Sequence, residues 1–286
     1  MDVFFVALLG GGLLLATSCA ASQPESGEAP PSTPSTSSAT QPGKTVVAPE
    51  DAAVTQLLER MDAAGDDMQT FTAGVLLREI DYDVMSEIPR LGRLSLDRTG
   101  ENVKFRVEFL GIIDESSNPP MLDPDKVDYI LIGDELIERT YNSRTQITRK
   151  LPPEHANLDL LKLGEGPFPL PIGQSPAEVR EQFDVALVDP AALDEDEGDV
   201  LIAEGATRLR LVPKPTSDFA GDFKWVDVDV DPSTGLPVKV ITLDKPEVNL
   251  QITTLRDPQV NAELPGDTFT LPEVNLAEWN VQYEAL

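Results

Sequence analysis

Alternation of apolar and polar residues with a period of two constrains the fold of this 286-residue chain more than any other feature of its sequence. An extended backbone points successive side chains to opposite faces, so such alternation predicts a strand with one buried and one solvated face. The clearest case is Asn102–Leu110, whose apolar face carries Val103, Phe105, Val107 and Phe109.

Eleven such runs follow one another, mostly joined by short turns. Asp231–Gly235 has the composition of a hairpin turn between two of them. An antiparallel sheet of this size is large enough to curl on itself, and 41% hydrophobic residues are enough to fill a substantial core. The runs are 70–84, 91–98, 102–110, 127–133, 136–141, 145–151, 199–203, 207–212, 223–230, 236–243 and 248–256.

A helix is expected before the first of these strands. Pro49–Asp51 places a proline and acids where a helix begins, and Gly65 is placed to end it. Between them, apolar residues repeat at helical spacing, which predicts an amphipathic helix. These residues are Val54, Leu57, Leu58 and Met61.

The middle of the chain predicts an irregular helical insert that interrupts the sheet. Leu158–Leu163 has the pattern of an apolar helical turn. Ser175–Glu178 is a capping box with Pro176 at the first helical position, which predicts a short helix toward Phe183.

An apolar stretch, Val3–Ala16, lies near the start of the chain. At 14 residues it is too short to span a bilayer and has the length of a signal-peptide core. Small residues lead from it into Cys19, an arrangement that resembles a bacterial lipobox. The resemblance implies a lipoprotein signal peptide over residues 1–18 and an acylated Cys19; the alternative is an ordinary signal peptide.

The rest of 19–49 is rich in Pro, Ser and Thr and predicts a disordered tether, because it cannot bury enough surface to offset the entropy of ordering.

The charge balance and the scarcity of reactive residues argue against several functions. The net charge of −28, from 22 Lys+Arg and 50 Asp+Glu, repels phosphate backbones, so we expect no nucleic-acid partner. The single histidine, His155, has no nucleophile motif near it, and the acidic run Asp194–Asp199 lacks the ligand spacing of a calcium loop. Asp227 and Asp229 alternate with valines and are expected on the solvent face of a strand. We therefore expect a protein that is not an enzyme and holds no cofactor and no metal.

One charged residue falls on an apolar face. Period two places Leu94, Leu96 and Arg98 together, so the guanidinium of Arg98 points into apolar surroundings if that face is interior. A buried charge is costly without a partner, so it would need a carboxylate, backbone carbonyls or the polar head of a ligand. The alternative is that the strand ends at Arg98 and its side chain reaches water.

Several short motifs follow one another along the chain in a specific order. They are Gly92-x-Leu94-x-x-x-Arg98, Gly133-Asp134-x-Leu136 leading to Tyr141-Asn142, Gln146-x-Thr148, Leu211-x-Pro213-Lys214, Asn261-x-x-Leu264 and Phe269-x-x-Pro272. Together with the amphipathic helix, they resemble the LolA/LolB superfamily of lipoprotein carriers over roughly residues 50–275. The resemblance implies a helical lid over an apolar cavity that holds acyl chains. It also makes Arg98 the match of a lid-contacting arginine, expected to hold the insert near Leu158–Leu163 or Phe183.

These features predict a fold that is mainly β with α: an incomplete antiparallel β-barrel of about eleven strands over residues 50–286, with an N-terminal helix and a helical lid insert. Its cavity is expected to be lined by Leu94, Leu96, Val103, Phe105, Val107, Phe109, Leu209, Leu211, Val226 and Val228.

The expected function is that of a cell-envelope lipoprotein that binds acyl chains of lipids or lipoproteins. Its partners would be a lipid or acylated lipoprotein and, through the N-terminal lipid, a membrane. The outer membrane is favoured, with lipoprotein sorting as the role. Two alternatives stay open: a regulatory or interaction lipoprotein like the RseB-type stress sensors, which share the fold, and a structural lipoprotein with a filled core. The sequence leaves the oligomeric state open.

Overall fold

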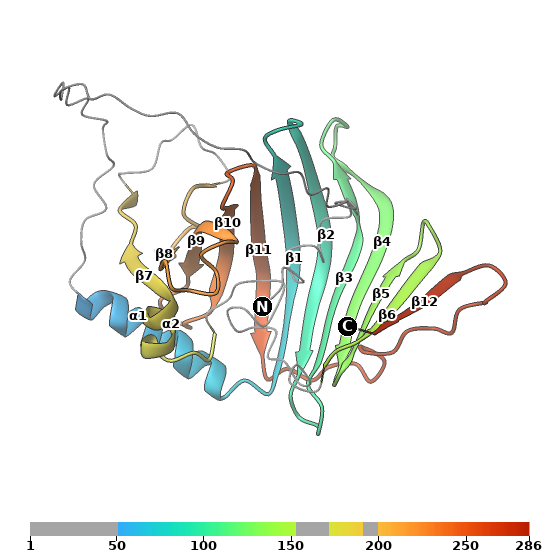
Figure 1. Ribbon diagram of the computed structural model, residues 1–286, viewed down its shortest axis with the longest axis horizontal. Coiled ribbons are helices and arrows are strands. Elements are labelled where there is room, and N and C mark those ends of the chain that lie inside the picture. Colours follow the sequence, from blue (N-terminus) through green and yellow to red (C-terminus); the bar gives the residue numbers. More distant parts are fainter. Residues whose placement is uncertain (1–50, 153–171, 191–199, 286) are drawn as a thin grey trace, which may run out of the picture.

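One open sheet of twelve strands runs through the residues that the computed structural model describes, 51–152, 172–190 and 200–285 (Figure 1). Its strand order is β12-β6-β5-β4-β3-β2-β1-β11-β10-β9-β8-β7, and neighbouring strands are antiparallel except for β12 and β6. The sheet ends at β12 and β7 without closing, which confirms the expected incomplete barrel. The strands are β1 (Thr70–Asp81), β2 (Ser86–Asp97), β3 (Lys104–Asp114), β4 (Met121–Ile132), β5 (Glu135–Thr140), β6 (Thr145–Lys150), β7 (Phe183–Leu187), β8 (Thr207–Pro213), β9 (Phe223–Val230), β10 (Pro237–Asp244), β11 (Asn249–Val260) and β12 (Asn280–Ala285).

Ten of the eleven expected strands are present. The expected strand at 199–203 is wrong in its described part, because residues 200–203 form a loop that packs over the sheet. Two strands were not expected. β7 follows α2 without a turn, since Phe183 already has extended backbone angles, and β12 is short and largely exposed.

Two helices lie on one face of the sheet, beside β7 to β10 in Figure 1. The first, α1 (Asp51–Asp66), buries its expected apolar stripe against that face, and the second is α2 (Pro176–Gln182). The Ser175 hydroxyl accepts a hydrogen bond from the backbone N–H of Glu178, and the carboxylate of Glu178 accepts one from the backbone N–H of Ser175. The expected capping box is therefore confirmed.

Backbone-to-backbone approach at two glycines fixes where α1 sits. Gly65 lies inside the last turn of α1 instead of ending it, and a Cβ there would lie 2.3 Å from the backbone nitrogen of Gly173. Gly235, in the β9–β10 turn, has φ +73°, and a Cβ there would lie 2.5 Å from the carbonyl oxygen of Arg60. The Arg60 side chain donates to the Pro232 carbonyl oxygen at 2.7 Å. The expected hairpin turn thus also serves as a docking point for α1.

The opposite face of the sheet, called here the outer face, buries charged residues under the loop at 200–203. Asp227 and Asp229 were expected in solvent, but they are 0% and 1% exposed. Arg208, also 0% exposed, donates from Nε to Asp229 Oδ1 at 2.5 Å and from Nη1 to the Val200 carbonyl oxygen. The prediction failed because alternation reports which face a residue is on, and here a loop covers the polar face as well.

The chain after β11 crosses the other half of the outer face. Arg106 on β3 donates to the carbonyl oxygen of Thr268 at 2.7 Å, and Arg139 on β5 donates to that of Pro272 at 2.8 Å. The rings of Tyr141 and Trp279 then meet edge to face, with centroids 5.6 Å apart. These contacts lead the chain to β12, which pairs with β6.

Several expectations lie outside the described residues: the signal peptide over 1–18, acylated Cys19 and its tether, the start of the first helix at Pro49, His155, the helical turn Leu158–Leu163, and the acidic run Asp194–Asp199. In the part of the chain that is described, neither helix is long and apolar enough to cross a membrane.

Removing Arg208 is expected to destabilise the protein strongly. In Arg208→Met the apolar stem is kept, but Asp229 is left as a buried charge without its main partner, which costs about 3–5 kcal/mol of unfolding free energy. Arg144→Met is the matched control, because Arg144 is 58% exposed and its ion pair with Glu278 should contribute less than about 1 kcal/mol. Urea unfolding of both variants measures the difference; equal losses would contradict this account of the outer face.

Candidate functional site: the inner face of the sheet

The residues expected to line a cavity come together on the inner face, the face that α1 covers. Nine of the ten are buried in one hydrophobic cluster, and Val103 is partly buried and packs against it. They come from β2, from β3 and Val103 just before it on one side, and from β8 and β9 on the other. Apolar residues of the strands between them, including Val75, Val240 and Leu255, complete the cluster.

Strand register explains why these residues meet. Leu94 lies opposite Val107, and Leu96 lies opposite Phe105. In the other half of the sheet, Leu209 lies opposite Val228. Directly opposed residues of antiparallel strands share a face, so each pair extends the same apolar surface.

This surface is closed to water. Leu94, Leu96, Leu209 and Val228 are each 0% exposed, and Phe105 is 2% exposed. A ligand that reached these side chains would first have to displace groups that pack against them. The inner face can therefore hold an acyl chain only after a rearrangement of its cover.

Arg98 ties β2 to the end of α1. Its Nη1 donates to the carbonyl oxygens of Gly65 at 3.2 Å and Met68 at 3.3 Å, while its backbone N–H donates to the Gln69 carbonyl oxygen at 2.8 Å. A cation at a helix C-terminus is favourable because the last carbonyls carry partial negative charge. The Leu158–Leu163 turn expected to contact Arg98 lies outside the described residues.

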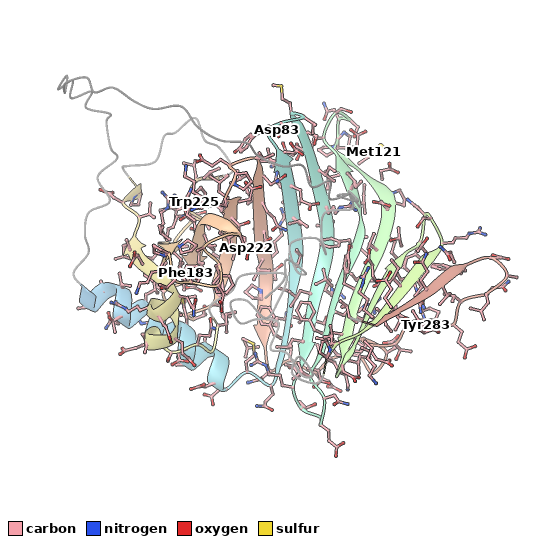
Figure 2. All side chains as sticks on the ribbon, viewed as in Figure 1. Asp83, Met121, Phe183, Asp222, Trp225 and Tyr283 are labelled. Atoms are coloured by element: carbon pink, nitrogen blue, oxygen red, sulfur yellow. The ribbon has the colours of Figure 1, made fainter. Side chains whose placement is uncertain are left out.

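A polar cluster occupies the opposite end of the inner face, toward the β1–β2 turn that contains Asp83 (Figure 2). Arg90 on β2 forms an ion pair with Asp125 on β4, at 2.8 Å from Nη1 to Oδ2, and its Nε lies 3.7 Å from Oε2 of Glu79 on β1. Tyr129 joins them from β4, with its ring edge-on to Phe109 at 6.4 Å. The apolar surface is thus bounded by charge at both ends.

Burial perturbs the titration of this cluster. It raises the pKa of the Glu79 carboxyl from 4.5 to about 7, and the nearby charge of Arg90 opposes that rise. Burial also raises the pKa of the Tyr129 hydroxyl. Near neutral pH, Glu79 therefore exists in both protonation states, unlike an ordinary surface glutamate.

Sequence reasoning missed this cluster, although one signal for it was present. Glu79 continues the period-two series of Val75 and Leu77, so its face could be read from the sequence. Arg90 and Asp125 could not be found in the same way, because β2 and β4 begin five and six residues before the expected strands.

Within the described ranges, no group of three or more His, Cys, Asp and Glu side chains is placed to hold a metal ion.

The raised pKa of Glu79 predicts how the free energy of unfolding depends on pH. Between pH 4.5 and 7 the folded protein keeps a proton that the unfolded chain releases, so this group makes the free energy of unfolding fall as pH rises through that range. Glu79→Gln should remove that dependence. It should leave stability near pH 4 almost unchanged and raise it at pH 8 by up to about 3 kcal/mol.

Urea midpoints at pH 4, 6 and 8 measure this effect, with Glu135→Gln as the matched control because Glu135 is exposed. If the two variants follow the same pH profile, burial does not govern the titration of Glu79.

Comparison with known proteins gives matches to structures only. No family model and no curated protein matches the chain. An uncharacterized conserved protein from Thermus thermophilus is 12% identical with a TM-score of 0.45, and the match covers 81% of this chain and 99% of that one. MucB in complex with MucA from Pseudomonas aeruginosa gives 15% identity and a TM-score of 0.41, covering 77% of this chain and 61% of that one, so the chain spans about three fifths of it.

A LolA superfamily protein from Nitrosomonas europaea is 15% identical with a TM-score of 0.29, and the match covers 75% of this chain and 96% of that one. The solved structures that match this chain thus include a protein named as a member of the superfamily that its sequence resembles.

Proposed function

We propose that this protein is a membrane-anchored lipoprotein of the bacterial cell envelope that binds acyl chains of lipids or lipoproteins against its inner face, without covalent chemistry. The observation that carries the proposal is the continuous apolar surface of β1 to β3 and β8 to β11, bounded by Arg98 at one end and by the Glu79–Arg90 cluster at the other. An acyl chain with a polar head would place its methylenes against the apolar surface and its head beside the charged groups at one of the two ends.

The energetics favour an acyl ligand once the cover moves. Each buried methylene contributes about 0.8 kcal/mol, so a whole chain outweighs a few polar contacts at the rim. Arg98 holds the end of α1 through side-chain hydrogen bonds to the carbonyl oxygens of Gly65 and Met68, so breaking these contacts would free this end of the cover. Release would then need a partner that offers more apolar surface.

The proposed anchor is Cys19. The proposal includes a signal peptide over 1–18, an acylated cysteine and tether over 19–49, and the folded domain from residue 50. A tether of about 30 residues would let that domain reach roughly 30 Å from a membrane on average. Location at the outer membrane and a role in lipoprotein sorting belong to the same proposal.

A second candidate is a structural lipoprotein with a filled core, and the burial of the inner face favours it. A regulatory lipoprotein that binds a partner protein, as MucB binds MucA in the matched complex, is the third. Saturable binding of a lipid probe distinguishes the first proposal from both.

Cys19→Ala is expected to release the protein from the membrane. The acylated cysteine is the proposed anchor, and the high net negative charge of the chain gives no electrostatic attraction to anionic lipid. Fractionation of cells followed by a high-salt wash measures the change. Retention of the variant in the membrane pellet, at the level of the wild type, would contradict the anchor.

The full chain is expected to bind a fluorescent fatty acid saturably, and Val107→Glu should weaken binding at least tenfold because it places a charge on the inner face. Val212→Glu is the matched control: Val107 is 1% exposed, whereas Val212 is 41% exposed and lies on the other face. Circular dichroism checks that each variant is folded.

If Val107→Glu does not fold, Val107→Thr adds a buried hydroxyl at nearly the same volume and should weaken binding in the same direction. A wild type that binds no probe would contradict the proposal and favour the filled core.

A further inference from the structure

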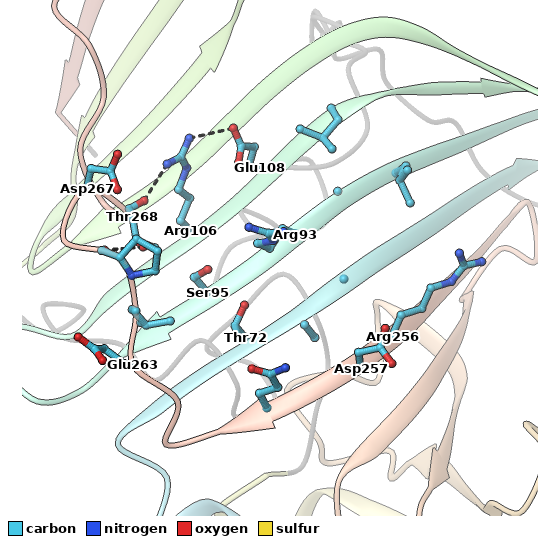
Figure 3. Close-up of a pocket in the computed structure, with 18 residues that line it drawn as sticks. Thr72, Arg93, Ser95, Arg106, Glu108, Arg256, Asp257, Glu263, Asp267 and Thr268 are labelled. Carbon is cyan, nitrogen blue, oxygen red and sulfur yellow. Dashed lines mark hydrogen bonds and ion pairs between the residues drawn. The ribbon is translucent and has the colours of Figure 1, made fainter.

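A groove of about 790 Å³ lies on the outer face, on the side of the sheet away from the proposed acyl site. Strands β1, β2, β3 and β11 form its floor, and the chain after β11 forms one wall (Figure 3). Its lining includes Thr72, Gly74, Arg93, Ser95, Arg256 and Gln259. The loop at 200–203 does not line this groove, and the proposed binding of acyl chains does not use it.

Register places two arginines on either side of a glycine in this floor. Gly74 on β1 lies opposite Arg93 on β2 and opposite Arg256 on β11, so all three share the outer face. Adjacent strands are about 4.8 Å apart, so the two arginine backbones are separated by roughly 10 Å. Gly74 has no side chain, so the floor between the two arginines stays open there. Figure 3 shows Arg93 and Arg256 on this floor, with the Arg256 side chain extending away from Arg93.

These two arginines differ from others on the sheet. Arg78, Arg90, Arg106, Arg149, Arg208 and Arg210 all form ion pairs with carboxylates. Among the described residues, neither Arg93 nor Arg256 forms an ion pair, although acids outnumber bases 50 to 22 in the chain. Arg93 lies opposite Glu108 and its charge acts on that carboxylate, but the two do not form an ion pair. Two guanidinium groups without ion pairs on an open floor are suited to bind an oxyanion, since each can donate two parallel hydrogen bonds to one.

Further polar groups extend the floor by one row. Gln259, Thr72 and Ser95 lie opposite one another on β11, β1 and β2. Ser95 is two positions from Arg93 on β2, and Gln259 is three positions from Arg256 on β11, where the register shifts. Their amide and hydroxyl groups can donate to phosphate or carboxylate oxygens.

The groove also carries acids, which limit what can bind. Asp257, Glu263 and Asp267 line it without ion pairs to described residues, whereas Glu108 pairs with Lys126 at 2.6 Å and with Arg106 at 3.2 Å. A ligand that is only anionic would be repelled by the three unpaired carboxylates. A ligand with an ammonium group close to its anionic group would satisfy both sets of charges.

From this arrangement we propose that the outer groove binds a zwitterionic phosphoamine of the phosphoethanolamine type. The phosphate lies over Gly74, with the side chains of Arg93 and Arg256 turned toward it, and the ammonium lies toward the carboxylates of Asp257, Glu263 or Asp267. The site is independent of acyl binding on the inner face, so either proposal can fail without the other.

Titration calorimetry of the full chain with O-phosphoethanolamine tests the site, with inorganic phosphate and ethanolamine titrated separately. Phosphoethanolamine should bind saturably and at least tenfold more tightly than either fragment. No saturable binding, or equal binding of inorganic phosphate, would overturn the proposal.

Arg93→Gln and Arg256→Gln should each weaken binding at least about tenfold, because each removes a charge-assisted contact to the phosphate. Arg144→Gln, outside the groove, is the control and should leave binding unchanged. Equal affinities in all three variants would overturn the assignment of the two arginines.

Gly74→Val tests the space itself without altering any charge. A Cβ at Gly74 would meet only Arg256, at 3.4 Å from its Cβ, and valine suits a strand, so the fold should be kept. The melting temperature should not fall, while phosphoethanolamine binding should be lost. Unchanged binding in a folded Gly74→Val protein would contradict a ligand between the arginines.

Co-sedimentation with vesicles distinguishes a lipid headgroup from a free metabolite as the source of the ligand. Phosphatidylethanolamine vesicles that co-sediment with the wild type but not with Arg93→Gln would identify a lipid headgroup. Binding of soluble phosphoethanolamine without vesicle binding would support the site and identify a free metabolite as its ligand.

Discussion

The inner face of an open sheet must be shielded from water by something other than the sheet, and much of this structure follows from that need. In a closed barrel the strands shield one another, but here β7 and β12 do not meet. Helix α1 takes over part of the task, and its docking relies on backbone groups. Gly65 and Gly235 let backbones touch, while Arg60 and Arg98 bind carbonyl oxygens. Side chains larger than hydrogen at the two glycines would hold the helix away from the face that it covers.

Arginines perform a related task on the outer face. Arg106, Arg139 and Arg208 each rise from a strand and donate to the carbonyl oxygens of a segment that has no regular structure to satisfy them. A buried carbonyl without a donor is costly, so these contacts stabilise segments that would otherwise remain solvated. The two covered regions leave the central strands open between them, and the polar groove lies there.

The alternation of apolar and polar residues determined most of what could be predicted. It located ten strands and the apolar side chains of the inner face, because a period of two links residue position directly to face. It could not tell which polar face is covered, so Asp227 and Asp229 were assigned to solvent. It also could not find Arg90 and Asp125, which lie in polar extensions of β2 and β4 where no apolar residue marks the strand. Arg93 and Arg256 flank Gly74 because β2 and β11 are the two neighbours of β1 in the sheet. Since β11 is distant from β1 and β2 in sequence, only the strand register reveals this arrangement.

The pairing of β1 with β11 has a consequence for how the chain reaches this structure. Strands β1 to β6 form one meander of neighbouring hairpins, and β8 to β11 form another, so each can assemble from local contacts. Only the β1–β11 seam joins them within the sheet, and it brings Phe71 beside Val260. Closing so long a loop costs conformational entropy before the seam gains its hydrogen bonds. We therefore expect the meanders to form early and the seam to close late, which leaves two unpaired strand edges exposed to other chains until the last step of folding.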